Sequence, residues 1–167
     1  MIDPLFQVAG KVFVVTGGLG QLGTEFTQVL SERHAKVAVF DSRESSSCPK
    51  SRMSGLDVLF CEVGITKRES TVRGLDAVTA QWCVPHGLIN CAAIDSRPNA
   101  SSNENGPFET YPEESWDRVM DTNLKGVFLC CQIVGGKMAE LGRGSIINIG
   151  SIYGVVSPDE RVYQYRR

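Results

Sequence analysis

The sequence lacks the features that would place it in several classes of protein. Its six cysteines include no CxxC pair, so their spacing indicates neither a zinc site nor a thioredoxin-like centre, and we expect no metal. No apolar run approaches the roughly 20 residues that cross a bilayer. The N-terminal residues lack the basic region and long apolar run of a signal peptide. The net charge of −2 gives no reason to expect nucleic acid or an anionic membrane as a partner.

The 167 residues have an ordinary globular balance, with 42% hydrophobic and 22% charged side chains. No repeat or low-complexity tract is evident, so residues 1–167 are predicted to form a single domain. Most cysteines lie in apolar runs, and we expect them to be small buried side chains in a reducing compartment, which favours a cytoplasmic protein. They are Cys48, Cys61, Cys83, Cys91, Cys130 and Cys131.

Short apolar runs alternate with segments of helical periodicity. The runs predict strands at residues 12–15, 36–40, 57–62, 87–90 and 145–149. Helices are predicted at residues 21–33, at 66–82 with Thr66 as the cap, and from Pro112 to Gly142. This alternation predicts an α/β fold, a Rossmann-type doubly wound parallel sheet in three α/β/α layers.

The long helix after Pro112 carries one apolar stripe, which we expect to face the core. Its members are Trp116, Val119, Met120, Val127, Phe128, Cys131, Val134 and Met138.

A glycine-rich turn joins the first strand to the first helix, the context in which such a motif binds a dinucleotide. Gly17 and Gly18 permit a tight turn, Gly20 lets the main chain approach a pyrophosphate, and Gly23 lets helix and strand pack closely. Gln21 and Leu22 open the helix, where N–H groups and the helix dipole attract phosphates. The alternative is a glycine-rich connection that binds no ligand.

Asp41 ends the second strand, about 20 residues after the glycines. A carboxylate there can accept hydrogen bonds from the adenosine ribose and repels a 2′-phosphate, so NAD(H) is favoured over NADP(H). Arg43 is a complication, because a nearby arginine can serve a 2′-phosphate. The alternative for Asp41 is a turn residue without a ligand.

Four segments, in order, resemble motifs of the short-chain dehydrogenase/reductase family, and the resemblance covers nearly the whole chain. Thr16 to Gly23 is similar to the TGxxxGxG turn, although Gln21 stands where the commoner form has glycine. The other segments are similar to the NNAG motif, to the segment with the family's helical asparagine and to the segment with its serine. They are Asn90-Cys91-Ala92-Ala93, Asp121-Thr122-Asn123-Leu124 and Asn148-Ile149-Gly150-Ser151.

The resemblance implies an NAD(H)-dependent oxidoreductase that moves a hydride between nicotinamide and a secondary alcohol or ketone. It implies that Asn90, Ala92 and Asn123 help to bind the cofactor and that Asn123 and Ser151 are catalytic. In the family, the asparagine distorts its helix and holds a water of a proton relay. The alternatives are a partly buried Asn123 satisfied by a neighbouring strand and a Ser151 that bonds to backbone. Family members commonly associate through the long helix, so the resemblance allows a homo-oligomer and leaves the oligomeric state open.

The family's tyrosine and lysine, four residues apart, have no YxxxK counterpart here. The nearest string runs from Tyr163 to Arg167, and arginine supplies a planar fork in place of a point charge. Either these two residues replace the pair, or the chain stops before it and the fold is incomplete at its C-terminus. Besides an oxidoreductase, the sequence therefore allows an inactive dinucleotide-binding module or sensor, or a domain that binds another nucleotide or none.

Overall fold

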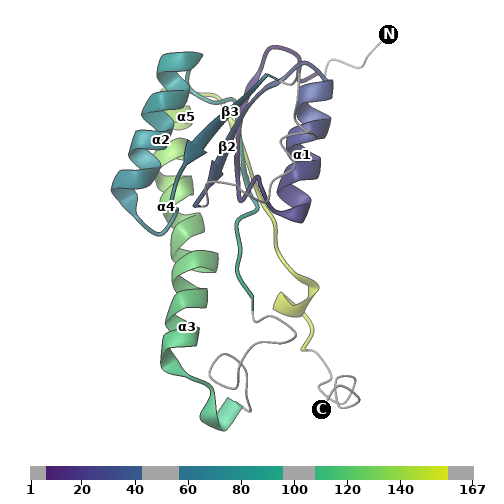
Figure 1. Ribbon diagram of the computed structural model, residues 1–167. Coiled ribbons are helices and arrows are strands. Elements are labelled where there is room, and N and C mark those ends of the chain that lie inside the picture. The colour runs from purple at the N-terminus through teal and green to yellow at the C-terminus, as the bar shows by residue number, and fades with distance from the viewer. Residues whose placement is uncertain (1–6, 43–56, 96–107, 158–167) are drawn as a thin grey trace.

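A computed structural model describes residues 7–42, 57–95 and 108–157. Its centre is a five-stranded sheet in the order β3-β2-β1-β4-β5, with every neighbouring pair parallel. All carboxyl ends therefore meet at one edge of the sheet, the lower edge in Figure 1. The strands are β1 Val12–Thr16, β2 Lys36–Asp41, β3 Val58–Glu62, β4 Gly87–Asn90 and β5 Ser145–Asn148. The predicted strands are confirmed.

Helices cover both faces of the sheet, with α1 on one face and α2 and the long helix on the other (Figure 1). The long helix is continuous but contains two π-helical segments, η4 and η5. The bounds are α1 Gln21–Glu32, α2 Arg68–Gln81, α3 Glu113–Met120, η4 Asp121–Gly126, α4 Val127–Cys130, η5 Cys131–Gly135 and α5 Gly136–Glu140. Two short 3-10 turns are η3 Phe108–Thr110 and η6 Ile152–Gly154. The predicted three-layer parallel architecture is confirmed.

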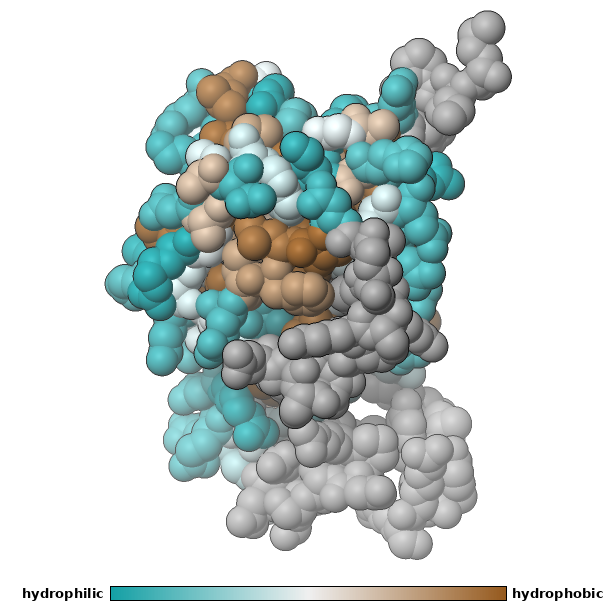
Figure 2. Space-filling view, turned by 45° about the horizontal axis from the view of Figure 1, so that its top comes forward, coloured by the Kyte–Doolittle hydropathy of each residue, from teal (hydrophilic) through white to brown (hydrophobic). Residues whose placement is uncertain are grey.

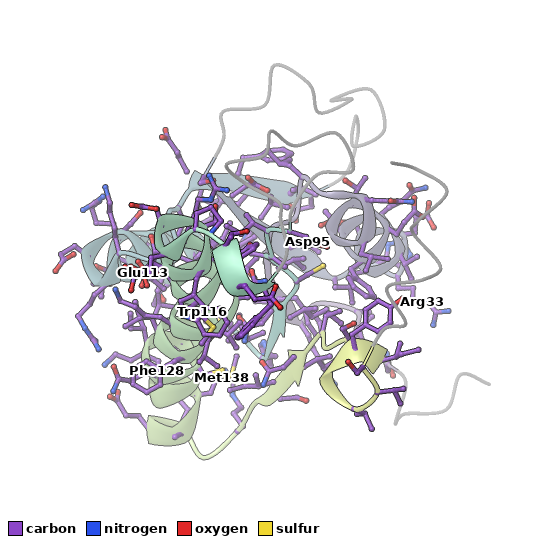
Figure 3. The ribbon with its side chains drawn as sticks, turned by 90° about the horizontal axis from the view of Figure 1, so that it is seen from below. Arg33, Asp95, Glu113, Trp116, Phe128 and Met138 are labelled. Carbon is purple, nitrogen blue, oxygen red and sulfur yellow. The ribbon has the colours of Figure 1, made fainter. Side chains whose placement is uncertain are left out.

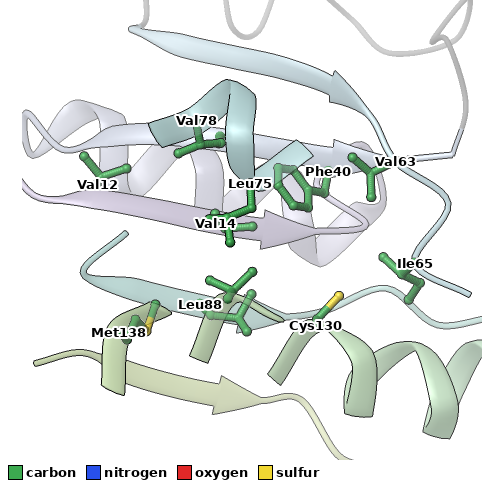
Figure 4. Packing of buried hydrophobic residues seen from close by; sticks show 12 residues of the cluster. Val12, Val14, Phe40, Val63, Ile65, Leu75, Val78, Leu88, Cys130 and Met138 are labelled. Atoms are coloured by element: carbon green, nitrogen blue, oxygen red, sulfur yellow. The ribbon is translucent and has the colours of Figure 1, made fainter. Parts of the chain in front are cut away.

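The alternation of side chains along each strand divides the core into two clusters. Val14 and Phe40 point to the face of α2 and the long helix and pack with Leu75 and Val134 (Figure 4). Val15, Val37, Val39 and Ile89 point to the opposite face and pack with Phe26 and Leu30 of α1. Strands that are buried on both faces are typical of parallel sheets, which explains their continuous apolar sequences.

The edges of the sheet are less covered than its centre. Every residue of β5 is exposed, and Ile147 is 51% exposed. At the other edge, Phe60 of β3 is 46% exposed, and Figure 2 shows apolar side chains gathered on that side between hydrophilic ones.

Two predictions about the helices are wrong. Thr66 does not cap α2, because a turn with a hydrogen bond from Lys67 N to Gly64 O comes first and the helix begins at Arg68. The long apolar stripe is only partly core, since Trp116 and Phe128 are 55% and 56% exposed. Figure 3 shows both on the long helix together with the buried Met138, and α3 extends beyond the sheet in Figure 1. Trp116 of α3 therefore has no sheet surface on which to pack.

The described cysteines are free thiols. Cys130 is buried, and burial raises its pKa to about 12, so it is a neutral core side chain. The other four are only half-buried, less than the sequence predicts, and Cys48 lies outside the described residues.

His86 lies at the amino-terminal edge of the sheet and forms two hydrogen bonds with the start of β1. Its Nδ1 accepts a hydrogen bond of 3.1 Å from Val12 N, and its backbone N–H donates to Val12 O at 2.7 Å. An imidazole that accepts at Nδ1 must be unprotonated there. Desolvation lowers the pKa of His86 below its usual 6.5, and the positive charges of Arg143 and Lys11 lower it further.

We expect the free energy of unfolding to fall in weak acid because of His86. The unfolded chain binds the imidazole proton more readily than the folded one, so this contribution is complete above about pH 6.5 and is lost as the pH falls through the folded-state pKa. Urea unfolding at about pH 7.5 and about pH 5 measures the loss. His86→Asn, which can accept the Val12 N–H without titrating, is expected to lose this dependence, whereas His34→Asn should keep it. Equal pH dependence in both variants would contradict the assignment.

Candidate functional site

The glycine-rich turn lies between β1 and α1 at the carboxyl edge of the sheet. Gly17 has a φ of +63°, and its N–H donates to Phe40 O at 2.7 Å, which ties the turn to β2. A Cβ on Gly17 would lie 2.6 Å from Ala92 Cα. Both the dihedral angle and the close approach of the loop after β4 therefore require glycine here.

The other glycines of the turn are also crowded. A Cβ on Gly23 would overlap Gly17 O, and one on Gly18 would lie 2.7 Å from Val39 Cγ1. Gly20 is the N-cap of α1, and among the described residues no side-chain hydrogen bond caps the helix. The turn thus brings an uncapped helix N-terminus to the carboxyl edge, a geometry that favours an anion.

A cavity of about 230 Å³ opens beside this turn. Its walls come from the carboxyl ends of β1, β2 and β4, from the segment after β3 and from the long helix. They are Gly17, Leu19, Gly20, Phe40, Asp41, Ser42, Val63, Ile65, Cys91, Ala92, Ala93, Ile94 and Thr122. Ligands of open parallel sheets bind outside the carboxyl ends of the strands, where this cavity lies.

Four of the predicted cofactor-binding residues line the cavity, namely Gly17, Gly20, Asp41 and Ala92. Six predicted residues do not line it, namely Gly18, Gln21, Leu22, Gly23, Asn90 and Asn123. Gln21 and Leu22 are exposed at the start of α1, whereas Gly18 and Gly23 are packed inside the turn. The ligand contacts of all these residues stay a prediction.

Asp41 is half-buried at the end of β2, and its Oδ2 accepts a hydrogen bond of 3.2 Å from Leu19 N. The carboxylate therefore joins the glycine turn to the second strand and brings a negative charge to the cavity wall. It is more than the simple turn residue that the sequence left open.

Thr16 holds the loop after β4 in place. Its Oγ1 accepts hydrogen bonds of 3.1 Å from both Cys91 N and Ala92 N, and its side chain is 1% exposed. Burial raises the pKa of the Cys91 thiol, so this cavity-lining cysteine is neutral near pH 7. The cavity is thus bounded by a loop that one buried hydroxyl fixes.

Asn90 lies behind that loop, within the sheet rather than at the cavity. Its Nδ2 donates to Asn148 Oδ1 at 2.8 Å and to Cys131 Sγ at 3.3 Å, and its backbone oxygen accepts from Ile149 N at 3.0 Å. Asn90 Oδ1 is buried without a partner among the described residues. Asn90 therefore joins β4, β5 and the long helix next to the site.

Asn123 lies in the π segment η4, where the sequence predicts a distortion of the long helix. Its amide bonds the backbone of Ile94 in both directions, with Nδ2 donating to Ile94 O and Ile94 N donating to Oδ1, each at 2.9 Å. The side chain is exposed rather than partly buried. The amide is thus satisfied by a neighbouring segment, and a catalytic role of Asn123 stays a prediction.

Ser151 follows β5 and caps the short turn η6. Its Oγ accepts a hydrogen bond of 3.2 Å from Tyr153 N, the backbone contact that the sequence allowed as an alternative. This contact occupies a lone pair and leaves the hydroxyl able to donate. Arg43, Tyr163 and Arg167 lie outside the described residues.

The sequence prediction missed the apolar wall of the cavity, which includes Phe40, Val63, Ile65 and Ile94. Phe40 precedes Asp41 in the sequence. Val63 and Ile65 follow β3, and in a parallel sheet the carboxyl end of β3 lies at the same edge as those of β1 and β2. It also missed Thr122, the neighbour of Asn123. Position after a parallel strand was the available signal for these residues.

Within residues 7–42, 57–95 and 108–157, no group of three or more histidine, cysteine or acidic side chains is placed to hold a metal ion. Over the same ranges, no helix has the length and apolar character needed to cross a membrane.

Comparison with known proteins connects the site to chemistry. The sequence model of the short chain dehydrogenase family matches residues 11–165. An NAD-dependent glycerol dehydrogenase of Listeria innocua is 31% identical over 96% of this chain, and a D-threitol dehydrogenase of Mycolicibacterium smegmatis is 28% identical over 96%. A short chain dehydrogenase of Leptospira borgpetersenii, solved with bound NAD⁺, superposes with a TM-score of 0.81 at 30% identity and covers 97% of this chain. The chain spans 59–60% of the lengths of these three proteins.

Proposed function

Because the chain belongs to the short-chain dehydrogenase family, we propose that it binds NAD(H) and serves a hydride transfer between nicotinamide and a secondary alcohol or ketone. The observation that carries the proposal is the cavity at the carboxyl edge, where Gly17, Gly20 and Asp41 meet. The NAD-dependent glycerol dehydrogenase and the NAD⁺-bound structure among its relatives support the choice of cofactor.

The residues present fit a dinucleotide. A Cβ at Gly17 would occupy the space where the loop after β4 approaches, and Gly20 leaves the N-terminus of α1 uncapped for a pyrophosphate. Asp41 provides a carboxylate for ribose hydroxyls, and Val63, Ile65 and Ile94 provide an apolar wall for a base. At about 230 Å³, the cavity is below the roughly 300–1,000 Å³ of sites for whole ligands, so it suits one end of the dinucleotide.

Bound NAD(H) would supply the hydride, and the chain's own residues would position the substrate and move the proton. We propose that the Ser151 hydroxyl donates a hydrogen bond to the substrate oxygen, because its contact with Tyr153 N uses only an acceptor site. We propose that Asn123 takes part in proton transfer through the distorted segment η4, while its amide stays on Ile94.

A second proposal, an inactive dinucleotide-binding module, has its own support. The side chains of Asn123 and Ser151 are both engaged with backbone groups. Binding and turnover of NADH separate the two proposals.

The proposals are tested by titrating the chain with NADH and by following NADH oxidation with a panel of ketones and aldehydes. We expect saturable binding. Turnover clearly above buffer supports the oxidoreductase, and binding without turnover supports the module. Absence of NADH binding would contradict both and leave a domain for another nucleotide or none.

Asp41 is expected to decide between NADH and NADPH. Asp41→Ala removes a charge and the acceptor of Leu19 N–H, so NADH affinity should fall by about tenfold to a hundredfold. Asp41→Asn keeps an acceptor oxygen but removes the charge that repels a 2′-phosphate, so affinity for NADPH relative to NADH should rise. Calorimetric titration with both nucleotides measures this, with Asp57→Asn at the amino-terminal edge as control. An unchanged NADPH to NADH ratio in Asp41→Asn would argue against the ribose contact.

We further propose that residues 1–167 form a single domain whose copies associate and that the protein works in the cytoplasm. The exposed Trp116, Leu124 and Phe128 of the long helix support association, because apolar patches of this kind mark interfaces. The free thiols of the described cysteines support a reducing compartment.

A further inference from the structure

Three residues of the π segment η4 either line the cavity or contact residues that line it. Thr122 lines the cavity itself. Asn123 bonds Ile94, and Gly126 lies against Ile65, both of which are lining residues. One turn of the long helix therefore supports a large part of one cavity wall. Such π segments occur frequently at functional sites.

Gly126 makes the closest of these approaches. A Cβ there would lie 2.6 Å from Ile65 Cδ1 and 2.8 Å from Ile65 Cγ1, and the next nearest atom is Asp121 O at 3.5 Å. Glycine is less favourable than alanine inside a helix, so its presence at a buried position calls for a packing reason. Here the reason is the side chain of Ile65, which fills the space that a Cβ would occupy.

Ile65 lies between the packed core and the cavity. It is 6% exposed, belongs to the core cluster with Val63 and Cys130, and is also one of the residues that line the cavity. Core side chains are close-packed, so an isoleucine displaced by a methyl group at position 126 moves into the open space. Since Cδ1 is the end of a flexible side chain, this displacement narrows the cavity without preventing folding.

We propose that Gly126 is a positioning residue whose missing side chain sets the place of Ile65 and thereby the width of the nucleotide cavity. This inference rests on the proposed binding of NAD(H). It gives residue 126 control over cofactor affinity, although Gly126 does not line the cavity.

The test compares Gly126→Ala with Gly136→Ala. Gly136 lies in the same long helix and is exposed, and no atom of the described residues would lie within 4 Å of a Cβ there. It therefore reports the effect of alanine on the helix alone. We expect Gly126→Ala to remain folded and to bind NADH about tenfold more weakly. Gly136→Ala should bind like the parent chain and melt at the same or a higher temperature.

A second substitution separates displacement of Ile65 from general damage. Ile65→Ala removes both atoms that a Cβ at position 126 would meet. In this background we expect Gly126→Ala to cause no further loss of NADH affinity. Unchanged binding in Gly126→Ala, or an equal loss in both backgrounds, would overturn the inference.

The δ1-methyl NMR signal of Ile65 gives a readout that does not depend on NADH. It should shift in Gly126→Ala and stay in place in Gly136→Ala. If the signal shifts but the parent chain binds no NADH, the proposed function fails while the control of Ile65 by residue 126 stands. If the signal does not shift, the inference is wrong whatever the chain binds.

Discussion

Gly17→Ala is expected to abolish measurable NADH binding, a loss of at least about a hundredfold, and to lower the free energy of unfolding by about 3 kcal/mol. Two costs combine at this position. The φ of +63° is unfavourable for any residue with a Cβ, and the new Cβ would lie 2.6 Å from Ala92 Cα. Ala92 Cα is a backbone atom of the loop after β4, which Thr16 holds in place. The glycine-rich turn and this loop must therefore move apart, and the cavity between them becomes wider.

Gly10→Ala is the matched control for this variant. Gly10 also has a positive φ, of +73°, but within the described part of the chain no atom lies within 4 Å of a Cβ there. We expect Gly10→Ala to lower the free energy of unfolding by about 1–2 kcal/mol, because of the dihedral angle alone, and to leave NADH affinity unchanged. Urea unfolding and NADH titration of both variants measure the difference, and equal effects would mean that the approach of Ala92 has no role.

Thr16→Val is expected to lower the free energy of unfolding by about 2–4 kcal/mol, although it changes almost no volume. The buried Oγ1 accepts from both Cys91 N and Ala92 N, and valine leaves both donors without that partner. The loop after β4 should loosen, so NADH affinity should fall as well. Hydrogen exchange at these two amides and NADH titration measure the effect.

Thr27→Val provides the comparison. Thr27 is fully buried in α1, but its Oγ1 donates to Gly23 O, which also accepts the ordinary helical hydrogen bond. Removing this hydroxyl leaves no donor unsatisfied, so we expect a cost below about 1 kcal/mol and normal NADH binding. If both variants behaved alike, the two contacts of Thr16 would not explain its effect.

The strands could be predicted closely from the sequence because each is a short apolar run bounded by turn residues. Runs such as Val12–Thr16 are buried on both faces, and that burial imposes a continuous apolar sequence. The burial of the side chains of α3 could not be predicted in the same way. Periodicity shows which residues share a stripe, but exposure of Trp116 depends on whether a sheet lies beneath it.

The residues that line the cavity also fall into a group that the sequence predicts and a group that it does not. Gly17, Gly20 and Asp41 were found from spacing, because a phosphate-binding turn and a strand-end carboxylate have fixed positions along a βαβ unit. Val63, Ile65 and Thr122 reach the cavity from segments distant in the sequence, and nothing local distinguishes them from ordinary core residues. The hydrogen-bond partners of Asn123 and Ser151 are seen only in the coordinates, and the catalytic roles of both residues stay a prediction.

The sequence by itself determined the succession of strands and helices along the chain, the parallel sheet and the place of the glycine-rich turn. These depend on periodicity, glycine conformation and short spacing, which are local properties of the chain. Only the tertiary structure decided that Ala92 crowds Gly17, that Thr16 fixes the loop after β4, and that Gly126 makes room for Ile65. Each of these is a contact between segments brought together by the sheet, and its strength depends on distances of a few tenths of an ångström.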